Sequence, residues 1–455
     1  RAAVHLPGTC LRVVSLLALL GGACRVSAQP QEPVPDARGC SDWPKRPGET
    51  FVSLDGASKF EVEPFFLARQ GDLVIAWEAC GCDDLTRIGY VRRGLAAEFD
   101  KPRYLASPNG QMASNITLAQ DRAGSLYVTW ASWTPGPDPA QPHVQVSDIH
   151  IQFARWPAGA VGFESPVELS EPIADSLYDK PWMIVTSDDV IVISYSDLRR
   201  GGILTVSSVD GGASFRRAVV DPSTSNLSAP CPDGRPGGAF VTYFANRTIR
   251  AAHTADGGVT WSGPVAAAVV DSSGDVAAQD PTCIASGDEV WIAYGRTHIR
   301  ANLPVEPLVA VHVAHLTLGT DVPDHDVVAL DGNAQASFDG GTGAGFLLFP
   351  QLARNVDGTL GLAVYRALSE GIGTADLVVV VSTDGGRSFQ SPIAFATGLT
   401  PSLQRHVPDW LGDYFGWGPT AAGLGAAFID NASGFSHIAF DESVLSSPVQ
   451  GGAGQ

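Results

Sequence analysis

Short apolar segments recur along the chain, and each ends in an aromatic or small residue. Most of them follow a turn signal made of Gly, Asp or Ser, and a further short strand, such as Pro64–Ala68 or Pro181–Val185, precedes the turn. Each repeating unit is therefore predicted to begin with a β-hairpin. The seven apolar segments are Leu73–Trp77, Leu126–Trp130, Val190–Tyr195, Ala239–Tyr243, Val290–Tyr294, Leu360–Tyr365 and Leu424–Phe428.

A second motif follows the hairpin in three units and has the form Ser/Thr-x-Asp-x-Gly-x-x-aromatic. Its copies are Ser208–Phe215, Thr254–Trp261 and Ser382–Phe389. The Asp carboxylate can accept main-chain N–H bonds across such a turn, the Gly permits positive φ, and the hydroxyl adds a second local bond. The aromatic ring can pack between neighbouring sheets. Three copies at similar distances from a hairpin indicate one repeated structural unit.

This motif is the Asp-box, or BNR repeat, and the chain resembles the sialidase superfamily of β-propellers over roughly residues 50–445. Asp179–Trp182 and Gly412–Gly416 are also similar to segments of secreted bacterial proteins with this repeat. The resemblance implies an all-β propeller of four-stranded antiparallel blades. The hairpins favour seven blades of about 61 residues each, while six blades of about 71 residues stay open. A strand at Phe51–Leu54 is expected to close the ring by joining the last blade.

The beginning of the chain has the pattern of a secretory signal peptide. Arg1 and Arg12 precede the apolar run Val13–Leu20, and Val26–Ala28 provides a small-x-small ending. The predicted organisation is a signal peptide at 1–28, a linker at 29–49, the propeller at 50–445 and a flexible C-terminal tail at 446–455. The protein is therefore expected to be secreted or periplasmic. Lipid attachment at Cys24 is disfavoured, because Gly21 stands where Leu or Val is wanted.

Charge and composition exclude several classes of partner. The chain has 48 acidic and 29 basic residues, a formal charge of −19 and no tract rich in Lys or Arg. Nucleic acid and anionic membrane surfaces are therefore not expected partners. No later window offers eighteen apolar residues, so no transmembrane segment is expected. Cys80-Gly-Cys82 lacks a second pair at zinc spacing and no Asp-x-Asp-x-Asp-Gly loop is present, so no metal or other cofactor is predicted. The oligomeric state stays open.

The cysteines predict a disulfide within the propeller. Cys231 and Cys283 lie at nearly equal distances before the aromatic ends of consecutive predicted strands. Neighbouring inner strands can approach closely enough for these two residues to be joined. Pairing of Cys40 with Cys80 or Cys82 is a second hypothesis.

The repeated Asp residues of the motif are assigned to the scaffold. One active site cannot use the same position of three blades that radiate in different directions, so Asp210, Asp256 and Asp384 are expected to be structural. Propeller sites form where the innermost strands converge on the central channel. Polar residues that open the first strand of each unit are therefore the better candidates, with strand capping and binding of channel water as their alternative role. They are Glu63, Asn115, Asp179, Lys180, Asp280, Gln351, Asp413 and Tyr414.

The resemblance to sialidases implies specific site chemistry. Such a site needs arginines that grip a sugar carboxylate, a Tyr nucleophile and an Asp as acid or base. The catalytic candidates are Tyr414, Asp413, Asp179 and Asp280. The substrate-binding candidates are Arg199, Arg296, Arg366, Glu63 and Gln351. The early Arg-Ile-Pro motif of the family is absent, because Glu63 stands before Pro64 where Arg would be wanted.

Three functions are compatible with these residues. The first is an exported sialidase-like propeller that recognises a glycan or glycoconjugate at its central channel, with or without hydrolysis of a glycosidic bond by an exo-α-sialidase type of reaction. The second is a non-catalytic propeller that binds a protein or a cell-envelope partner. The third is a polysaccharide-cleaving enzyme that uses paired carboxylates such as Asp179 and Asp280.

Overall fold

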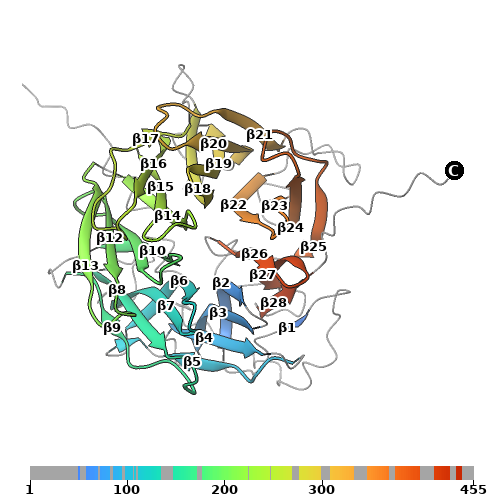
Figure 1. The fold of residues 1–455 in the computed structure, drawn as a ribbon. Helices are drawn as coiled ribbons and strands as arrows, with labels where there is room; N and C mark the ends of the chain where they lie inside the picture. The colour runs from blue at the N-terminus through green and yellow to red at the C-terminus, as the bar shows by residue number, and fades with distance from the viewer. Residues whose placement is uncertain are drawn as a thin grey trace, which may run out of the picture.

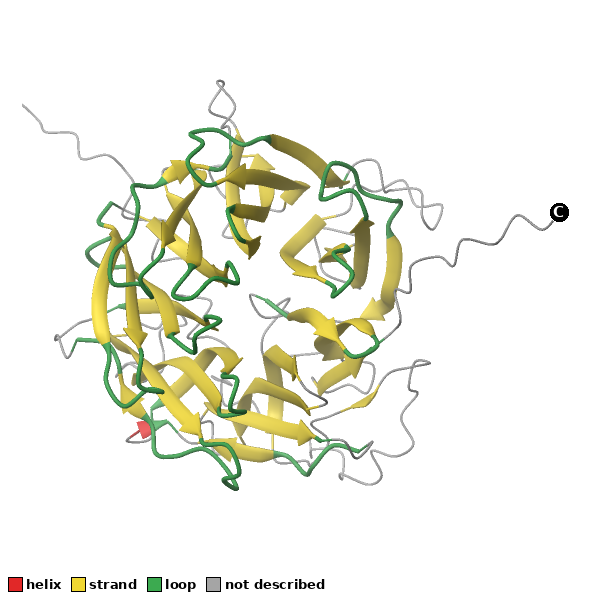
Figure 2. Cartoon of the chain, viewed as in Figure 1, coloured by secondary structure: helices red, strands yellow, loops and turns green. Residues whose placement is uncertain are grey.

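Seven four-stranded antiparallel sheets surround a common axis as the blades of a propeller (Figures 1 and 2). The predicted all-β propeller and the favoured count of seven blades are confirmed, and the six-blade alternative is wrong. The computed structural model describes residues 50–51, 58–69, 72–81, 86–94, 98–105, 107–108, 111–134, 147–171, 177–223, 225–245, 247–268, 276–298, 308–332, 346–367, 375–399, 414–430 and 437–442.

Within each blade the strands follow one another from the axis outward, as Figure 1 shows. Blade 1 consists of β2 (Ser58–Arg69), β3 (Asp72–Gly81), β4 (Thr86–Arg93) and β5 (Arg103–Leu105). Blade 2 consists of β6 (Met112–Gln120), β7 (Leu126–Thr134), β8 (Ser147–Trp156) and β9 (Val167–Glu168). Blade 3 consists of β10 (Tyr178–Val185), β11 (Ile191–Asp197), β12 (Ile203–Ser208) and β13 (Arg216–Asp221). Blade 4 consists of β14 (Ser225–Pro232), β15 (Ala239–Ala245), β16 (Thr248–Thr254) and β17 (Val265–Ala266).

The remaining blades follow the same order. Blade 5 consists of β18 (Val276–Ser286), β19 (Glu289–His298), β20 (Leu308–Thr317) and β21 (His325–Asp331). Blade 6 consists of β22 (Phe346–Arg354), β23 (Leu360–Ala367), β24 (Ala375–Ser382) and β25 (Ile393–Leu399). One residue pair, Leu308 with Leu347, joins blades 5 and 6 through the main chain.

Blade 7 is completed by the start of the described chain. Its strands are β26 (Gly416–Thr420), β27 (Gly423–Asp430), β28 (His437–Asp441) and β1 (Thr50–Phe51). The short strand β1 pairs antiparallel with β28, with Phe51 opposite Ala439. This confirms for Phe51 the prediction that a strand near residue 51 closes the ring, while residues 52–54 of that prediction lie outside the described residues. Segments about 390 residues apart thus share one sheet, which leaves no open edge between first and last blade.

A ring of buried aromatic residues occupies the second strand of every blade. This strand lies between the inner and third strands, and its two faces pack against the blades on either side, so a large side chain there loses all contact with water. None of the seven is more than 1 % exposed. They are Trp77, Trp130, Tyr195, Tyr243, Tyr294, Tyr365 and Phe428, which are the residues that end the seven apolar segments of the sequence.

The inner strands share an irregularity at the same position. In six blades two residues bulge out of register with the second strand, and the first residue of each bulge that has a described side chain adopts a left-handed conformation, with φ between 50° and 55°. Positive φ is costly for residues other than Gly, so it persists only where the surrounding structure enforces it. The five left-handed residues are Glu63, Asn115, Lys180, Leu227 and Phe349, and Asp280 holds the matching place in β18.

At the opposite end of the inner strands, arginines join consecutive blades. Arg69 donates to the carbonyl of Gln120, and Arg122 pairs with Asp189 at 2.9 Å. Arg235 bridges Asp233 of its own blade and Asp288 of the next. These contacts connect the hairpins of blades 1 and 2, of blades 2 and 3, and of blades 4 and 5.

Candidate functional site

Four of the predicted site residues meet in one buried cluster at the bulged end of blades 1 to 3. We call Glu63, Asn115, Asp179 and Lys180 the inner-strand cluster. The Lys180 ammonium donates to Asn115 Oδ1 at 2.7 Å and lies 4.0 Å from Glu63 Oε1. The Asn115 main-chain N–H donates to Glu63 Oε2 at 3.0 Å, and its amide nitrogen donates to Asp179 Oδ1 at 3.2 Å. A single network therefore connects three consecutive inner strands.

Burial makes this network electrostatically demanding. Glu63 is fully buried and Lys180 is 7 % exposed, so both charges have left bulk water. Such a pair is stable only when hydrogen bonds satisfy the remaining polar atoms. Here Asn115 bonds both charges, because its side-chain oxygen accepts from Lys180 and its main-chain N–H donates to Glu63. The left-handed backbone at Glu63, Asn115 and Lys180 aims all three side chains toward one another. The same left-handed backbone recurs at Leu227 and Phe349, so the buried charge distinguishes this location, and buried ionisable groups are typical of functional sites.

An aromatic trio lies beside the cluster and joins blades 7, 1 and 3. Trp182 of blade 3 contacts Phe65 of blade 1, with ring centroids 5.8 Å apart, and Tyr414, which precedes β26 of blade 7, at 5.7 Å. The Tyr414 hydroxyl donates to the carbonyl of Ile116 in blade 2 at 2.9 Å. Phe65 and Trp182 are half-buried, whereas Tyr414 is buried. The trio thus offers partly exposed aromatic surface next to the polar network.

The bulge determines how the predicted candidates are placed on their inner strands. Lys180, rather than Asp179, holds the left-handed position equivalent to Glu63 and Asn115. In blade 6 that position belongs to Phe349, and the predicted Gln351 lies two residues further along the strand, where it is buried. The main chain of Asp280 is part of β18, but its side chain and all of Asp413 lie outside the described residues.

The predicted arginines have contacts away from the cluster. Arg366 is buried and donates to Asp376 of its own blade at 2.8 Å. Arg296 lies 3.7 Å from Asp326, also within its own blade. Arg199 is exposed after β11, and its main-chain N–H donates to Asp197. A guanidinium already held by a carboxylate is a weaker clamp for a sugar carboxylate, so Arg296 and Arg366 are poorly prepared for that role.

The three Asp-Gly-Gly turns have nearly the same hydrogen bonds. Asp210 accepts from the hydroxyl and main-chain N–H of Ser214 and from Ser208. Asp256 accepts from both groups of Thr260 and from Thr254, and Asp384 accepts from both groups of Ser388 and from Ser382. The carboxylates are used within their own turns at the outer side of the blades, which supports the proposal that they are scaffold.

These hydrogen bonds predict unusually acidic carboxyl groups in the turns. The Ser214 hydroxyl, the Ser214 N–H and Ser208 lower the pKa of Asp210 to about 2, and the equivalent Ser388 and Ser382 groups lower the pKa of Asp384 to about 2. An ordinary Asp titrates at about 3.9, so the turns stabilise the fold above that pH and lose this contribution as the pH falls toward 2. Carbon-13 NMR of the carboxyl groups should give midpoints near 2. Ser214→Ala should raise the midpoint of Asp210 and leave that of Asp384 unchanged; unshifted midpoints in the wild type would contradict this description of the turns.

Cys231 and Cys283 form a disulfide between the inner strands of blades 4 and 5, as the sequence predicted, with their Cα atoms 5.8 Å apart. Cys40 and Cys82 lie outside the described residues, as does the side chain of Cys80, and the same holds for the predicted signal peptide, linker and tail. Within the described ranges, no helix is long and apolar enough to cross a membrane. In the same ranges, no group of three or more His, Cys, Asp or Glu side chains is arranged to hold a metal ion.

Phe65 and Trp182 are the site residues that the sequence analysis did not identify. Both stand two positions after a left-handed residue, with Pro64 or Pro181 between. The repeat of a polar residue, Pro and an aromatic residue in blades 1 and 3 was the available signal. This repeat does not identify site residues by itself, because the bulge determines which face of the inner strand each side chain lies on.

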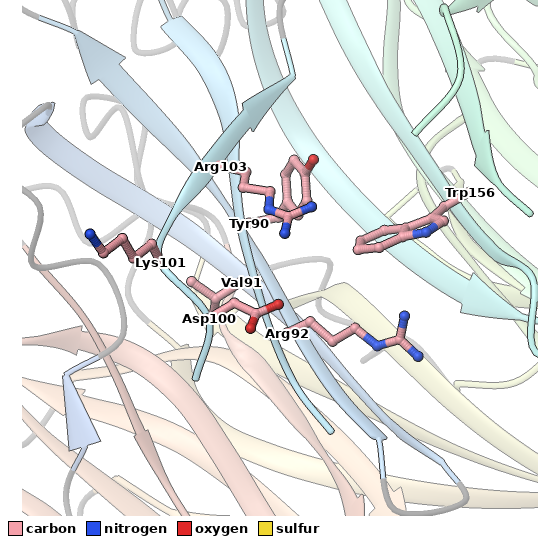
Figure 3. A pocket seen from close by; sticks show the side chains of 7 residues that line it. All are labelled: Tyr90, Val91, Arg92, Asp100, Lys101, Arg103 and Trp156. Carbon is pink, nitrogen blue, oxygen red and sulfur yellow. The ribbon is translucent and has the colours of Figure 1, made fainter. Parts of the chain in front are cut away.

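A shallow groove at the outer edge of blade 1 is a weaker candidate for a binding site than the inner-strand cluster. Tyr90, Arg92, Asp100, Lys101, Arg103 and Trp156 line it together with Val91 (Figure 3). The charged ends of Arg92, Lys101 and Arg103 point in different directions in Figure 3. Arg92 pairs with Asp72 at 2.6 Å, and Arg103 donates to the carbonyl of Val161. The groove therefore does not gather its positive charges on one point.

Comparison with known proteins supports the fold and leaves the family open. No protein-family model matches the chain, and no curated protein matches it. Among solved structures, it is similar to a Hadza microbial sialidase, with 14 % identity over 86 % of this chain and 68 % of that chain, at a TM-score of 0.49. It is also similar to the NanB sialidase of Streptococcus pneumoniae, with 8 % identity over 71 % and 68 %, at 0.46. A polysaccharide lyase described as an ulvan lyase of family PL25 has 12 % identity over 82 % and 92 %, at 0.50. At these identities the similarity concerns the propeller fold alone.

Proposed function

We propose that this propeller recognises a glycan or glycoconjugate at the bulged end of its axis, over the inner-strand cluster and the aromatic trio. The inner-strand cluster carries the proposal. Three strained residues from consecutive blades place a charged pair and an amide beside the partly exposed rings of Phe65 and Trp182. Aromatic surface next to a few fixed polar groups is the usual composition of a small-molecule site. Its propeller neighbours include sialidases and a polysaccharide lyase, which is consistent with this class of ligand.

Hydrolysis by Tyr414 is a separate part of the proposal. A tyrosine nucleophile needs a base that takes its proton. The Tyr414 hydroxyl is positioned by a hydrogen bond to the main-chain carbonyl of Ile116. The sialidase-like reaction belongs to the proposal as a step to be tested, with Tyr414 as nucleophile and Asp179 as the candidate acid or base.

The disulfide supports a location outside the reducing cytosol. Disulfides persist in oxidising compartments, and Cys231–Cys283 is built between two inner strands of the ring. We propose that the protein is secreted or periplasmic, as its first 28 residues predict, and that Asp-box turns of the sialidase type form its scaffold.

A glycan array tests the recognition directly. Wild-type protein should bind at least one class among neutral, sialylated, uronate-containing and sulfated glycans, and Trp182→Ala should weaken that binding at least tenfold, which corresponds to about 1.4 kcal/mol. Trp417→Ala is the matched control, because Trp417 is also half-buried on an inner strand but donates to Gly361 between blades 6 and 7. Absence of binding to any class, or equal loss in both variants, would reject the proposed site.

Hydrolysis is tested separately with a fluorogenic sialoside. Release by the wild type that is abolished in Tyr414→Phe would establish a sialidase reaction. No release above the blank, together with binding on the array, would leave a non-catalytic glycan-binding propeller. Binding to a protein partner without any glycan binding would favour the second function predicted from the sequence.

A further inference from the structure

Histidines are concentrated in blade 5. Four of the ten histidines of the chain, His298, His312, His315 and His325, lie on strands β19, β20 and β21. His312 and His315 point to opposite faces of the blade, since they are three residues apart on β20. His312 stacks on Tyr294 and pairs with Asp326, whereas His315 contacts Trp291 and His325.

His315 is buried, and its ring is surrounded by two aromatic rings and two carboxylates. Its ring stacks on His325, with centroids 4.9 Å apart and planes at 27°, and lies 4.8 Å from the ring of Trp291. Asp324 Oδ2 is 3.1 Å from Nδ1, and Glu289 Oε1 is 3.6 Å from Nε2. Neither ring nitrogen makes a well-aligned hydrogen bond within the described part of the chain. A buried imidazole without such bonds is poorly prepared to hold a proton.

Trp291 connects this histidine pair to the next blade. Its indole N–H donates to the carbonyl of Gly385 at 2.8 Å, in the Asp-Gly-Gly turn of blade 6. The Arg354 guanidinium of blade 6 lies over its ring at 5.4 Å. Gly386 approaches so closely that a Cβ there would lie 3.1 Å from Trp291 Cδ1. We call this contact between Trp291 and the turn at 382–389 the blade 5/6 seam.

We propose that His315, stacked on His325, makes the blade 5/6 seam an acid-sensitive joint, which is closed when the His315 ring is neutral and loosens when this ring takes up a proton. A protonated His315 would be a buried charge stacked on the ring of His325, with the positive charge of Arg387 of blade 6 near it. Asp324 and Glu289 offset part of this charge, but both are exposed and are screened by water. Separation of the His315 and His325 rings exposes the charge of His315 to water. This movement takes His315 away from Trp291 and releases the indole from Gly385.

The pKa of His315 in the closed joint is shifted in the direction that the proposal requires. Burial lowers the pKa of His315, His325 lowers it further, and Asp324 and Glu289 act in the opposite direction. A histidine in the unfolded or opened state titrates at about 6.5. The closed seam therefore contributes its full stability above about pH 6.5 and loses it as the pH falls below that value, because the open form binds the proton more tightly.

Hydrogen–deuterium exchange of the intact protein tests the joint. The seam peptides around Trp291 and Gly385 should exchange about tenfold faster at pH 5.5 than at pH 7.5 after correction for intrinsic rates, as expected for opening linked to one proton at a pKa of about 6.5. The Asp-Gly-Gly turn around Asp256 provides an internal reference and should not change by this factor.

Two variants distinguish titration of His315 from a general effect of acid. His315→Phe keeps a ring on Trp291 and cannot titrate, so its seam should exchange equally at both pH values. His312→Gln, on the other face of β20, should keep the wild-type response. A wild-type seam that is equally protected at both pH values would overturn the proposal, and so would an acid response that survives in His315→Phe. If His315→Phe does not fold, His325→Gln gives the same test, and its expected result is a smaller acid response.

Discussion

Replacing Cys231 and Cys283 together with Ala is expected to lower the free energy of unfolding by about 4 kcal/mol. The two residues are 52 apart in sequence, so the bond closes a long loop that contains most of blade 4 and joins it to blade 5. Removing the cross-link releases the conformational entropy of that loop in the unfolded chain. The bond also connects two inner strands of a closed ring, so its loss weakens the contact between blades 4 and 5.

Denaturant unfolding of the double variant measures the effect. A reduced wild-type sample is the control, because it should show a similar fall in the denaturation midpoint without any change of side chain. Thiol titration under denaturing conditions, before and after reduction, reports whether the bond was present. An unchanged midpoint in both samples would show that the bond contributes little to the stability of the ring.

Lys180→Met is expected to destabilise the fold by about 3–5 kcal/mol, the cost of leaving a buried carboxylate without its opposite charge. Lys180 donates to Asn115 and lies 4.0 Å from Glu63, which is fully buried. Met preserves most of the volume of the side chain and, like Lys, is an L residue at positive φ, so the comparison isolates the charge.

The paired variant Glu63→Gln with Lys180→Met should recover much of the lost stability, because it removes both charges of the Glu63–Lys180 pair. Asp179 keeps the hydrogen bonds that it accepts from the Asn115 amide and from the main-chain N–H of residue 180. Arg122→Met is an exposed control: its ion pair with Asp189 resembles the Lys180 pair in chemistry but lies in water, and its loss should have a far smaller effect. Equal destabilisation by Lys180→Met in the presence and absence of Glu63→Gln would contradict the network described for the inner-strand cluster.

The repeat made the fold predictable from sequence. Each blade must bury one aromatic residue between its neighbours, so Trp77, Tyr243 and Phe428 repeat at the same place in seven units, and that periodicity is visible without structure. The Asp-Gly-Gly turns are equally local, because all their hydrogen bonds lie within a few residues. The Cys231–Cys283 bond could be predicted from the repeat as well, because two equivalent positions in consecutive blades must be neighbours.

The site was less predictable because it depends on the bulge. An extended strand alternates its side chains, so sequence alone placed Gln351 with Glu63 and missed Phe65 and Trp182. The bulge shifts that alternation and gives the left-handed position of blade 6 to Phe349. The arginine partners were also hidden. Asp326 lies on the outer strand β21, thirty residues after Arg296, and the pairing of Asp376 with Arg366 depends on the register of β23 with β24.

The most direct test of the account is to locate the ligand. The chain contains ten tryptophans, so fluorine NMR of protein labelled with 5-fluorotryptophan gives a small set of signals that can be assigned by single Trp→Phe variants. Addition of the best glycan from the array should shift or broaden the signal of Trp182 and leave that of Trp156, at the outer groove, unchanged. A glycan that binds and shifts Trp156 while the Trp182 signal stays constant would contradict a site at the inner-strand cluster.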